Sequence, residues 1–345
     1  MKAKSNKMKL KLPPYLQIIE YIRGNYYCHL ISLAAKLGIA DLLAKGPKSL
    51  KELATMTDTH APNLYRALRA LTSIGIFEEK ESKIFSQNSL SKILQINSPI
   101  SMKNTTLMIG SDWYEKAWSN IFYSIKTGKP AFDNIFGMTL FEYFNIHPKD
   151  RTVYDNNMSS LTNLISPVII NSYDFSKFQT IIDIGGGNGS LLMRILKNNP
   201  SLNGILYDIP EAVEGARKLL EKENLLKRCK IINGDFFQTV PKGGDAYILK
   251  LILHDWNDKN ASKILRNCHK SMNSDSKLLL IEHILSKGDL QNAAIFMDLE
   301  MMVFSEGGHE RTEEEFRKLL NNAGFKLIKI IPIPPYFILE GRKNS

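Results

Sequence analysis

Apolar positions recur with two different periods along the chain, and the change of period divides it. From Leu16 to Leu43 they follow helical spacing, which Gly46 and Pro47 end. After Ser166, short apolar runs typical of buried strands alternate with segments of helical period. Such alternation predicts an α/β fold on a mainly parallel sheet, with ligands at the carboxyl ends of its strands.

Residues 49–86 have the outline of a winged helix, because their pattern predicts helix, turn, helix and then a hairpin from Ile76 to Phe85. Two uses are open. The helix Pro62–Ile74 could read DNA through Arg66 and Arg69. The same helices could instead pack against a second subunit. The hairpin is acidic where DNA phosphate would lie, and acidic side chains would repel that phosphate. The sequence therefore favours the dimerisation module.

Aromatic residues are dense between Asp112 and Phe144, and a helix from Arg151 to Ile165 then leads through Pro167 into a linker. We therefore expect four regions. Residues 1–14 form a basic disordered tail, 15–100 a mostly helical winged-helix domain, 101–165 a helical linker that also contributes to an acceptor pocket, and 166–345 a catalytic α/β domain.

A glycine-rich turn follows the strand that ends near Ile184 and precedes a helix, which is the arrangement of a nucleotide site. Gly185, Gly187 and Ser190 meet the dinucleotide pattern G-x-G-x-x-G/A only loosely. Asp183, with glycines at 185, 187 and 189, meets D-x-G-x-G-x-G. A carboxylate there suits the amino group of S-adenosylmethionine and would repel a pyrophosphate, so this cofactor is favoured.

Later strand ends carry further polar residues. Asp208 stands where an acid binds both ribose hydroxyls, although it could instead cap the helix that begins at Pro210. Asp235 could accept a hydrogen bond from the adenine amino group while Phe236 packs on the ring. Another strand runs into Lys250 and the segment LHDW.

Composition narrows the class of protein without naming a partner. The chain has 345 residues, 43% of them hydrophobic, and a net charge of +10, half of which comes from five lysines near the N-terminus. A short basic end is more typical of a solvated tail than of a nucleic-acid arm. Cys28, Cys229 and Cys268 form no pair with metal-site or disulfide spacing. We expect a cytoplasmic protein with no metal, no nucleic-acid partner and no membrane span.

Five motifs stand in order: D-x-G-G-G-x-G, YDIP, GDFF, LHDW and GG-x-ERT. With them, the chain from about Leu16 to its C-terminus resembles the plant caffeate-type and microbial small-molecule O-methyltransferases. In that family a winged-helix dimerisation domain precedes a Rossmann-like class I methyltransferase domain with a mainly parallel seven-stranded sheet. The resemblance implies a homodimer, S-adenosylmethionine as methyl donor and a small hydroxylated acceptor.

The resemblance also implies roles for single residues. His254 would be the general base, with Glu282 and Glu310 as its partners. The implied cofactor contacts are Asp183, Gly185, Gly187, Asp208, Asp235, Phe236 and Lys250. The implied acceptor contacts are Tyr154, Met158, Thr162, Asp255, Met301 and Ser305. Two positions depart from the family: His309 stands where many relatives have Lys or Arg, and Glu300 where plant enzymes have an apolar pocket wall.

Base catalysis would explain the roles that the resemblance implies for His254, Glu282 and Glu310. A phenol has a pKa of about 10, so at neutral pH its oxygen needs a base, and imidazole has a suitable pKa range. Each residue also has a structural interpretation. His254 could be a hydrogen-bonded structural residue, and Glu310 could pair with Arg311 at the surface. A purely structural interpretation is harder for Glu282, because burying a carboxylate within the apolar run LLLIEHIL costs free energy unless the carboxylate has a partner.

The favoured function is methyl transfer to a phenolic or enolic hydroxyl of a small secondary metabolite. A winged-helix regulator that senses a ligand, a family variant that hydroxylates or decarboxylates without methyl transfer, and a dinucleotide-dependent reductase are the alternatives.

Overall fold

The computed structural model describes residues 12–213, 215–286 and 293–344. Residues 1–11 of the predicted basic tail lie outside these ranges. The chain divides between Ser111 and Asp112 into two compact units, a position different from the predicted boundaries after residues 100 and 165. Of the described helices, none is alone long and apolar enough to cross a membrane, and one bent pair, Pro14–Lys36 with Ile39–Lys45, meets that test by length and composition only.

The N-terminal unit contains the predicted helix–turn–helix and hairpin. Strands β2 and β3 form the hairpin, and β1 pairs with β3 in a three-stranded antiparallel sheet. The elements are α1 (Pro14–Lys36), α2 (Ile39–Leu42), η1 (Leu43–Lys45), β1 (Lys48–Ser49), α3 (Leu50–Met56), α4 (Ala61–Ser73), β2 (Phe77–Lys80), η2 (Glu81–Lys83), β3 (Ile84–Gln87), α5 (Ser89–Lys92) and α6 (Lys103–Ile109). Leucines of α3 and α4 pack on Phe77 and Phe85 of the hairpin, so the winged-helix prediction is confirmed.

The second unit begins with helices that precede its sheet. They are α7 (Asp112–Ser119), α8 (Ile121–Thr127), α9 (Ala131–Phe136), α10 (Leu140–Ile146) and α11 (Pro148–Ser172). The sequence predicts that this helix ends at Ile165, before Pro167. In the structure, α11 instead continues through Pro167 to Ser172. Pro167 cannot donate to the carbonyl of Asn163. The hydroxyl of Ser166 lies 3.4 Å from that oxygen and supplies a weak donor.

A seven-stranded sheet follows, with the order β11-β12-β8-β7-β4-β5-β6. Five neighbouring strands are parallel, and β12 and β11 complete the sheet in antiparallel fashion, so the predicted mainly parallel sheet is present. The strands are β4 (Thr180–Ile184), β5 (Asn203–Asp208), β6 (Cys229–Asn233), β7 (Ala246–Lys250), β8 (Lys277–Glu282), β11 (Phe325–Ile333) and β12 (Tyr336–Lys343). A separate pair joins β9 (Ile284–Leu285) to β10 (Arg311–Thr312).

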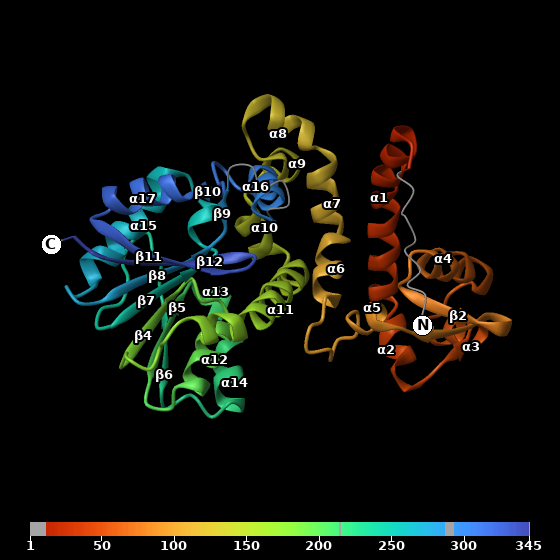
Figure 1. The fold of residues 1–345 in the computed structure, drawn as a ribbon, viewed down its shortest axis with the longest axis horizontal. Coiled ribbons are helices and arrows are strands. Elements are labelled where there is room, and N and C mark those ends of the chain that lie inside the picture. The colour runs from red at the N-terminus through yellow and green to blue at the C-terminus, as the bar shows by residue number, and fades with distance from the viewer. Residues whose placement is uncertain (1–11, 214, 287–292, 345) are drawn as a thin grey trace, which may run out of the picture. The chain divides into compact units, whose positions relative to one another are not determined.

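Helices cover both faces of the sheet (Figure 1). The helices that follow β4 in the chain are α12 (Ser190–Asn198), α13 (Pro210–Val213), α14 (Ala216–Lys222), η3 (Leu253–Asp255), α15 (Asp258–Ser271), α16 (Ala293–Phe304) and α17 (Glu313–Asn322). Of these, α16 packs on α7, α8 and α9 instead of on the sheet. Successive side chains of a strand point to opposite faces of the sheet. Accordingly, Ile181 packs with α12 and Ile182 packs with α15. The chain leaves β4 toward β5 on one side and returns to β7 on the other. This reversal of strand order is where open α/β sheets bind ligands.

Candidate active site

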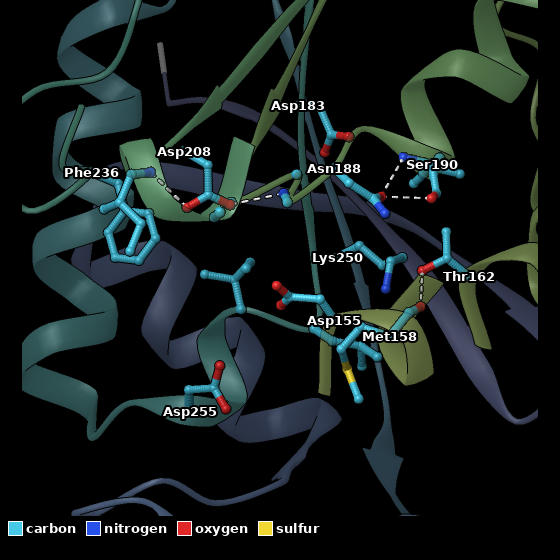
Figure 2. Close-up of a pocket in the computed structure, with 18 of the residues that line it drawn as sticks. Asp155, Met158, Thr162, Asp183, Asn188, Ser190, Asp208, Phe236, Lys250 and Asp255 are labelled. Atoms are coloured by element: carbon cyan, nitrogen blue, oxygen red, sulfur yellow. Dashed lines mark hydrogen bonds between the residues drawn. The ribbon is translucent and has the colours of Figure 1, made fainter. Parts of the chain in front are cut away.

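A cavity of about 330 Å³ lies at the carboxyl ends of β4, β5 and β7. Every residue predicted to contact a cofactor lines it: Asp183, Gly185, Gly187, Asp208, Asp235, Phe236 and Lys250. Figure 2 shows Asp183 and Asp255 toward opposite sides of the cavity, with Lys250 and Asp155 between them. Strand ends and the glycine turn therefore face the same space.

The glycine turn needs glycine for its backbone and for close packing. Gly185 and Gly187 have φ angles of +67° and +57°. A Cβ atom on Gly185 would lie 2.4 Å from Ile252 Cδ1. Next to this turn, burial raises the pKa of Asp183 to about 7, against the opposing charge of Lys250. A cation bound here would favour the carboxylate form.

Asp208 ends β5 and accepts hydrogen bonds from the backbone N–H groups of Gly187 and Ile209, each at 2.8 Å (Figure 2). Burial raises the pKa of Asp208, and these two hydrogen bonds oppose that shift. Asp235 follows β6 and accepts from the N–H of Phe237 at 2.7 Å. The rings of Phe236 and Phe237 meet edge to face and form an apolar wall beside the two carboxylates.

His254 is buried in the short helix η3, directly after the β7 strand end. Its Nδ1 lies 2.8 Å from Glu310 Oε1, and its Nε2 lies 3.7 Å from Asp255 Oδ1. Burial alone would lower the pKa of His254. The carboxylate of Asp255, the hydrogen bond to Glu310 and the charge of Glu282 outweigh burial and raise the pKa to about 10.

Glu282 does not hydrogen-bond the imidazole. Its Oε1 accepts from the backbone N–H groups of Ile252 and Leu253, at 3.1 and 2.9 Å, and it affects His254 through its charge. Burial raises the pKa of Glu282 to about 7. The alternative in which Glu310 pairs with Arg311 at the surface is wrong, because both side chains are buried and Glu310 bonds His254.

The expected acceptor residues divide into two groups. Tyr154, Met158 and Thr162 lie four residues apart on one face of α11 and line the cavity together with Asp255. Met301 is buried in α16 and Ser305 follows that helix, and neither lines the cavity.

Sequence reasoning missed several lining residues, namely Arg151, Asp155, Ser159, Asn188, Ser190, Phe237 and Trp256. The first three share the helix face of Tyr154 and Met158, so helical spacing could have found them.

The match to known proteins covers both units. Residues 118–326 match the O-methyltransferase domain, and residues 19–96 match the O-methyltransferase dimerisation domain. A phenazine O-methyltransferase of Lysobacter antibioticus is 40% identical over 91% of this chain and 92% of its own. The crystal structure of LaPhzM has a TM-score of 0.92 at 39% identity and covers 96% of this chain and 100% of that one.

A further structure was solved with ligands. NcsB1, an O-methyltransferase from neocarzinostatin biosynthesis, was crystallised with S-adenosylmethionine and 2-hydroxy-5-methyl naphthoic acid. It is 27% identical to this chain, with a TM-score of 0.79 and coverage of 92% and 96% of the two chains.

The chain therefore belongs to the S-adenosylmethionine-dependent O-methyltransferases, and the predicted fold class is confirmed. The cavity fits that methyl donor. Its lining includes five aspartates against only Arg151 and Lys250, which suits a ligand with two positive groups, a sulfonium and an ammonium. When bound, S-adenosylmethionine supplies an electrophilic methyl group.

Proposed function

We propose that this enzyme methylates a phenolic or enolic hydroxyl of a small, aromatic secondary metabolite, with His254 as the general base. The observation that carries this proposal is the hydrogen bond between His254 Nδ1 and Glu310. It fixes the tautomer with the proton on Nδ1 and leaves Nε2 as the atom that accepts a proton. His254 itself does not line the cavity, but the next residue, Asp255, does, and its Oδ1 lies 3.7 Å from His254 Nε2, which supports a position for Nε2 close to the bound acceptor.

The acidic surroundings of His254 have two effects. They stabilise the imidazolium that forms when the acceptor loses its proton. They also favour the protonated imidazole before the reaction, which would weaken the base. A cation in the cavity opposes the second effect, because like charges destabilise the imidazolium. We therefore propose that His254 is an effective base chiefly when the cofactor site is filled.

The acceptor class is inferred from the walls of the cavity. Tyr154 and Met158 offer a flat apolar surface, and the ring of Tyr154 packs on Phe144 with centroids 4.9 Å apart. Such walls suit an aromatic ring. The relatives support this class, since one is named for phenazine and another binds a naphthoic acid. Thr162, Met301 and Ser305 stay proposed contacts of the acceptor.

A labelling experiment tests the proposal. Purified enzyme, S-adenosylmethionine with a deuterated methyl group and a metabolite extract of the source organism are incubated together, and mass spectrometry seeks a labelled product. We expect a labelled aryl or enol ether. We expect His254→Gln to abolish at least about 99% of its formation, while the control His309→Gln, on a more exposed imidazole, retains it. Undiminished labelling with His254→Gln would disprove the role of base.

We also propose that catalysis needs no metal ion. His254, Glu282 and Glu310 lie close enough together to hold one. Three of their atoms are already engaged, however, because His254 Nδ1 bonds Glu310 Oε1 and Glu282 Oε1 accepts two backbone N–H groups. We expect turnover to survive dialysis against EDTA. Loss of turnover that Zn²⁺ restores would contradict this.

A further inference from the structure

Arg311 is the largest fully buried side chain among the described residues, with a relative exposure of 0%. Its guanidinium bonds three oxygen atoms. Nη1 donates to the carbonyl of Leu253 at 2.8 Å, Nη2 donates to the carbonyl of Trp256 at 2.7 Å, and Nε donates to Asp258 at 3.0 Å. The two carbonyls lie on either side of His254 and Asp255 in the chain. One planar group therefore spans the turn that carries the base.

Other groups hold the same turn at different atoms. Glu282 accepts from the N–H groups of Ile252 and Leu253, and the N–H of His309 donates to the carbonyl of His254 at 2.9 Å. The turn has weak bonds of its own, at 3.3 Å from Asp255 N and from Trp256 N. Leu251, which precedes it, has a φ of +54°, which is unfavourable for a branched side chain. The conformation is thus maintained largely by side chains and by the neighbouring segment.

We propose that Arg311 is a positioning residue that holds residues 253–256 in the conformation in which His254 can accept the proton. The proposal rests on the role of His254 as base. Arg311 acts from outside the cavity, since it does not line it. Its neighbour Glu310 bonds the imidazole, so residues 310 and 311 hold the ring and the backbone of one turn together.

Shape rather than charge explains the choice of arginine. The ion pair with Asp258 contributes little on its own, because the carboxylate side chain is 69% exposed. A lysine would keep the charge but has one nitrogen, which cannot reach both carbonyls in the geometry of the guanidinium. Arg311→Lys therefore removes the span across the turn and leaves the charge in place.

The test compares Arg311→Lys with Arg317→Lys, which alters an exposed arginine paired with Glu313. Turnover is followed with deuterated S-adenosylmethionine and the acceptor found by labelling, and cofactor affinity by calorimetry. We expect Arg311→Lys to lower kcat about 10- to 100-fold, because small misplacements of a reacting group cost rates of that order. The cofactor Kd should change less than about threefold, since the strand-end carboxylates remain. Arg317→Lys should change neither quantity.

A double variant separates this proposal from the proposed function. If Arg311 acts through His254, Arg311→Lys should cause no further loss of kcat in His254→Gln. An equal loss in both backgrounds would overturn the assignment, while the base role is judged by His254→Gln alone. Parallel losses of kcat, cofactor affinity and thermal stability in Arg311→Lys would also overturn it, since they indicate a structural role only.

Gly308→Ala provides a second route if Arg311→Lys does not fold. A Cβ at residue 308 would lie 2.7 Å from Ser305 Cβ, 2.9 Å from the carbonyl oxygen of His254 and 3.0 Å from that of Asp255, so it pushes on the same turn as well as on Ser305. We expect the same loss of kcat without loss of cofactor affinity. Full activity in Gly308→Ala would show that the position of the turn does not limit the reaction and would overturn the proposal.

Discussion

Asp255 makes the largest favourable contribution to the charged form of His254, since it heads the contributions that raise the pKa of the imidazole against the effect of burial. Asp255→Asn removes a negative charge and so lowers that pKa. A base must be unprotonated, so kcat/KM rises with pH through the pKa of His254. We expect Asp255→Asn to move this rising limb to lower pH by about 1 unit. A pH–rate profile measures the limb, whatever the height of its plateau.

The control for that profile is Asp275→Asn, which removes an exposed carboxylate far along the chain from the turn. It should leave the limb where it is. A limb that stays in place in Asp255→Asn, or moves to higher pH, would show that His254 does not set the pH dependence or that Asp255 does not face it.

Glu300 does not line the cavity, but its carboxyl group interacts with the charges of His254 and Asp255, and we propose that it also faces the bound acceptor. It accepts a hydrogen bond from Tyr114 at 3.2 Å, and burial raises its pKa, while Tyr114 and His254 oppose that shift. A carboxylated acceptor would be repelled by Glu300. We expect Glu300→Gln to raise kcat/KM for a hydroxynaphthoic acid over the matching naphthol about 5- to 30-fold, since a nearby charge is worth on the order of 1–2 kcal/mol.

The comparison uses the ratio of the two acceptors, because a ratio cancels general losses of activity. Glu306→Gln, at an exposed glutamate two residues beyond α16, is the matched control and should leave the ratio unchanged. An unchanged ratio in Glu300→Gln as well would mean that residue 300 does not face the acceptor.

At the scale of the element, α11 keeps its helical course through an exposed proline. Pro167 removes one backbone hydrogen bond in a helix of 25 residues, and Ser166 replaces it only at 3.4 Å. We expect Pro167→Ala to raise the free energy of unfolding by about 1–2 kcal/mol, after allowing for the greater freedom of the unfolded alanine chain. Urea unfolding measures this change. Val168→Ala, at the next exposed position, should change it by less than about 0.5 kcal/mol. A less stable Pro167→Ala would show that the helix is adapted to the proline.

Sequence periodicity found the elements whose signals are local. The apolar run that ends near Ile184 predicts β4, and the helical spacing from Leu16 predicts α1. The sequence-based prediction ended α11 too early. It relied on the rule that proline breaks a helix, and that rule does not allow for a neighbouring hydroxyl that donates to the free carbonyl. The cofactor residues that the family resemblance implies all line the cavity.

Interactions across long stretches of chain could not be found in this way. Glu282 looked like a partner of the imidazole but accepts from backbone groups about 30 residues earlier. Arg311 looked like a surface residue but is buried against residues more than 50 positions away. A charged residue in an apolar run shows that some partner exists, since burial without one is costly. Only the fold identifies that partner.

At the scale of the whole molecule, the dimerisation domain indicates a homodimer, and we expect α1 to provide a surface for it. Tyr15, Ile18, Ile19, Ile22 and Tyr26 are all exposed and follow helical spacing, so they form one apolar stripe along α1. A stripe of this kind is costly in water unless another surface covers it. We expect a second copy of the chain to do so.

Ile18→Asp with Ile22→Asp places two charges on that stripe, and desolvating them would cost more than the dimer contact returns. We expect light scattering after gel filtration to show a mass of 39.2 kDa instead of twice that value. Tyr21→Asp alters an equally exposed residue of α1 outside the stripe and should remain dimeric. Circular dichroism should show that each variant is folded. If the double variant is folded and still dimeric, the subunit interface lies elsewhere. If Tyr21→Asp is monomeric, the interface extends around α1 beyond the stripe.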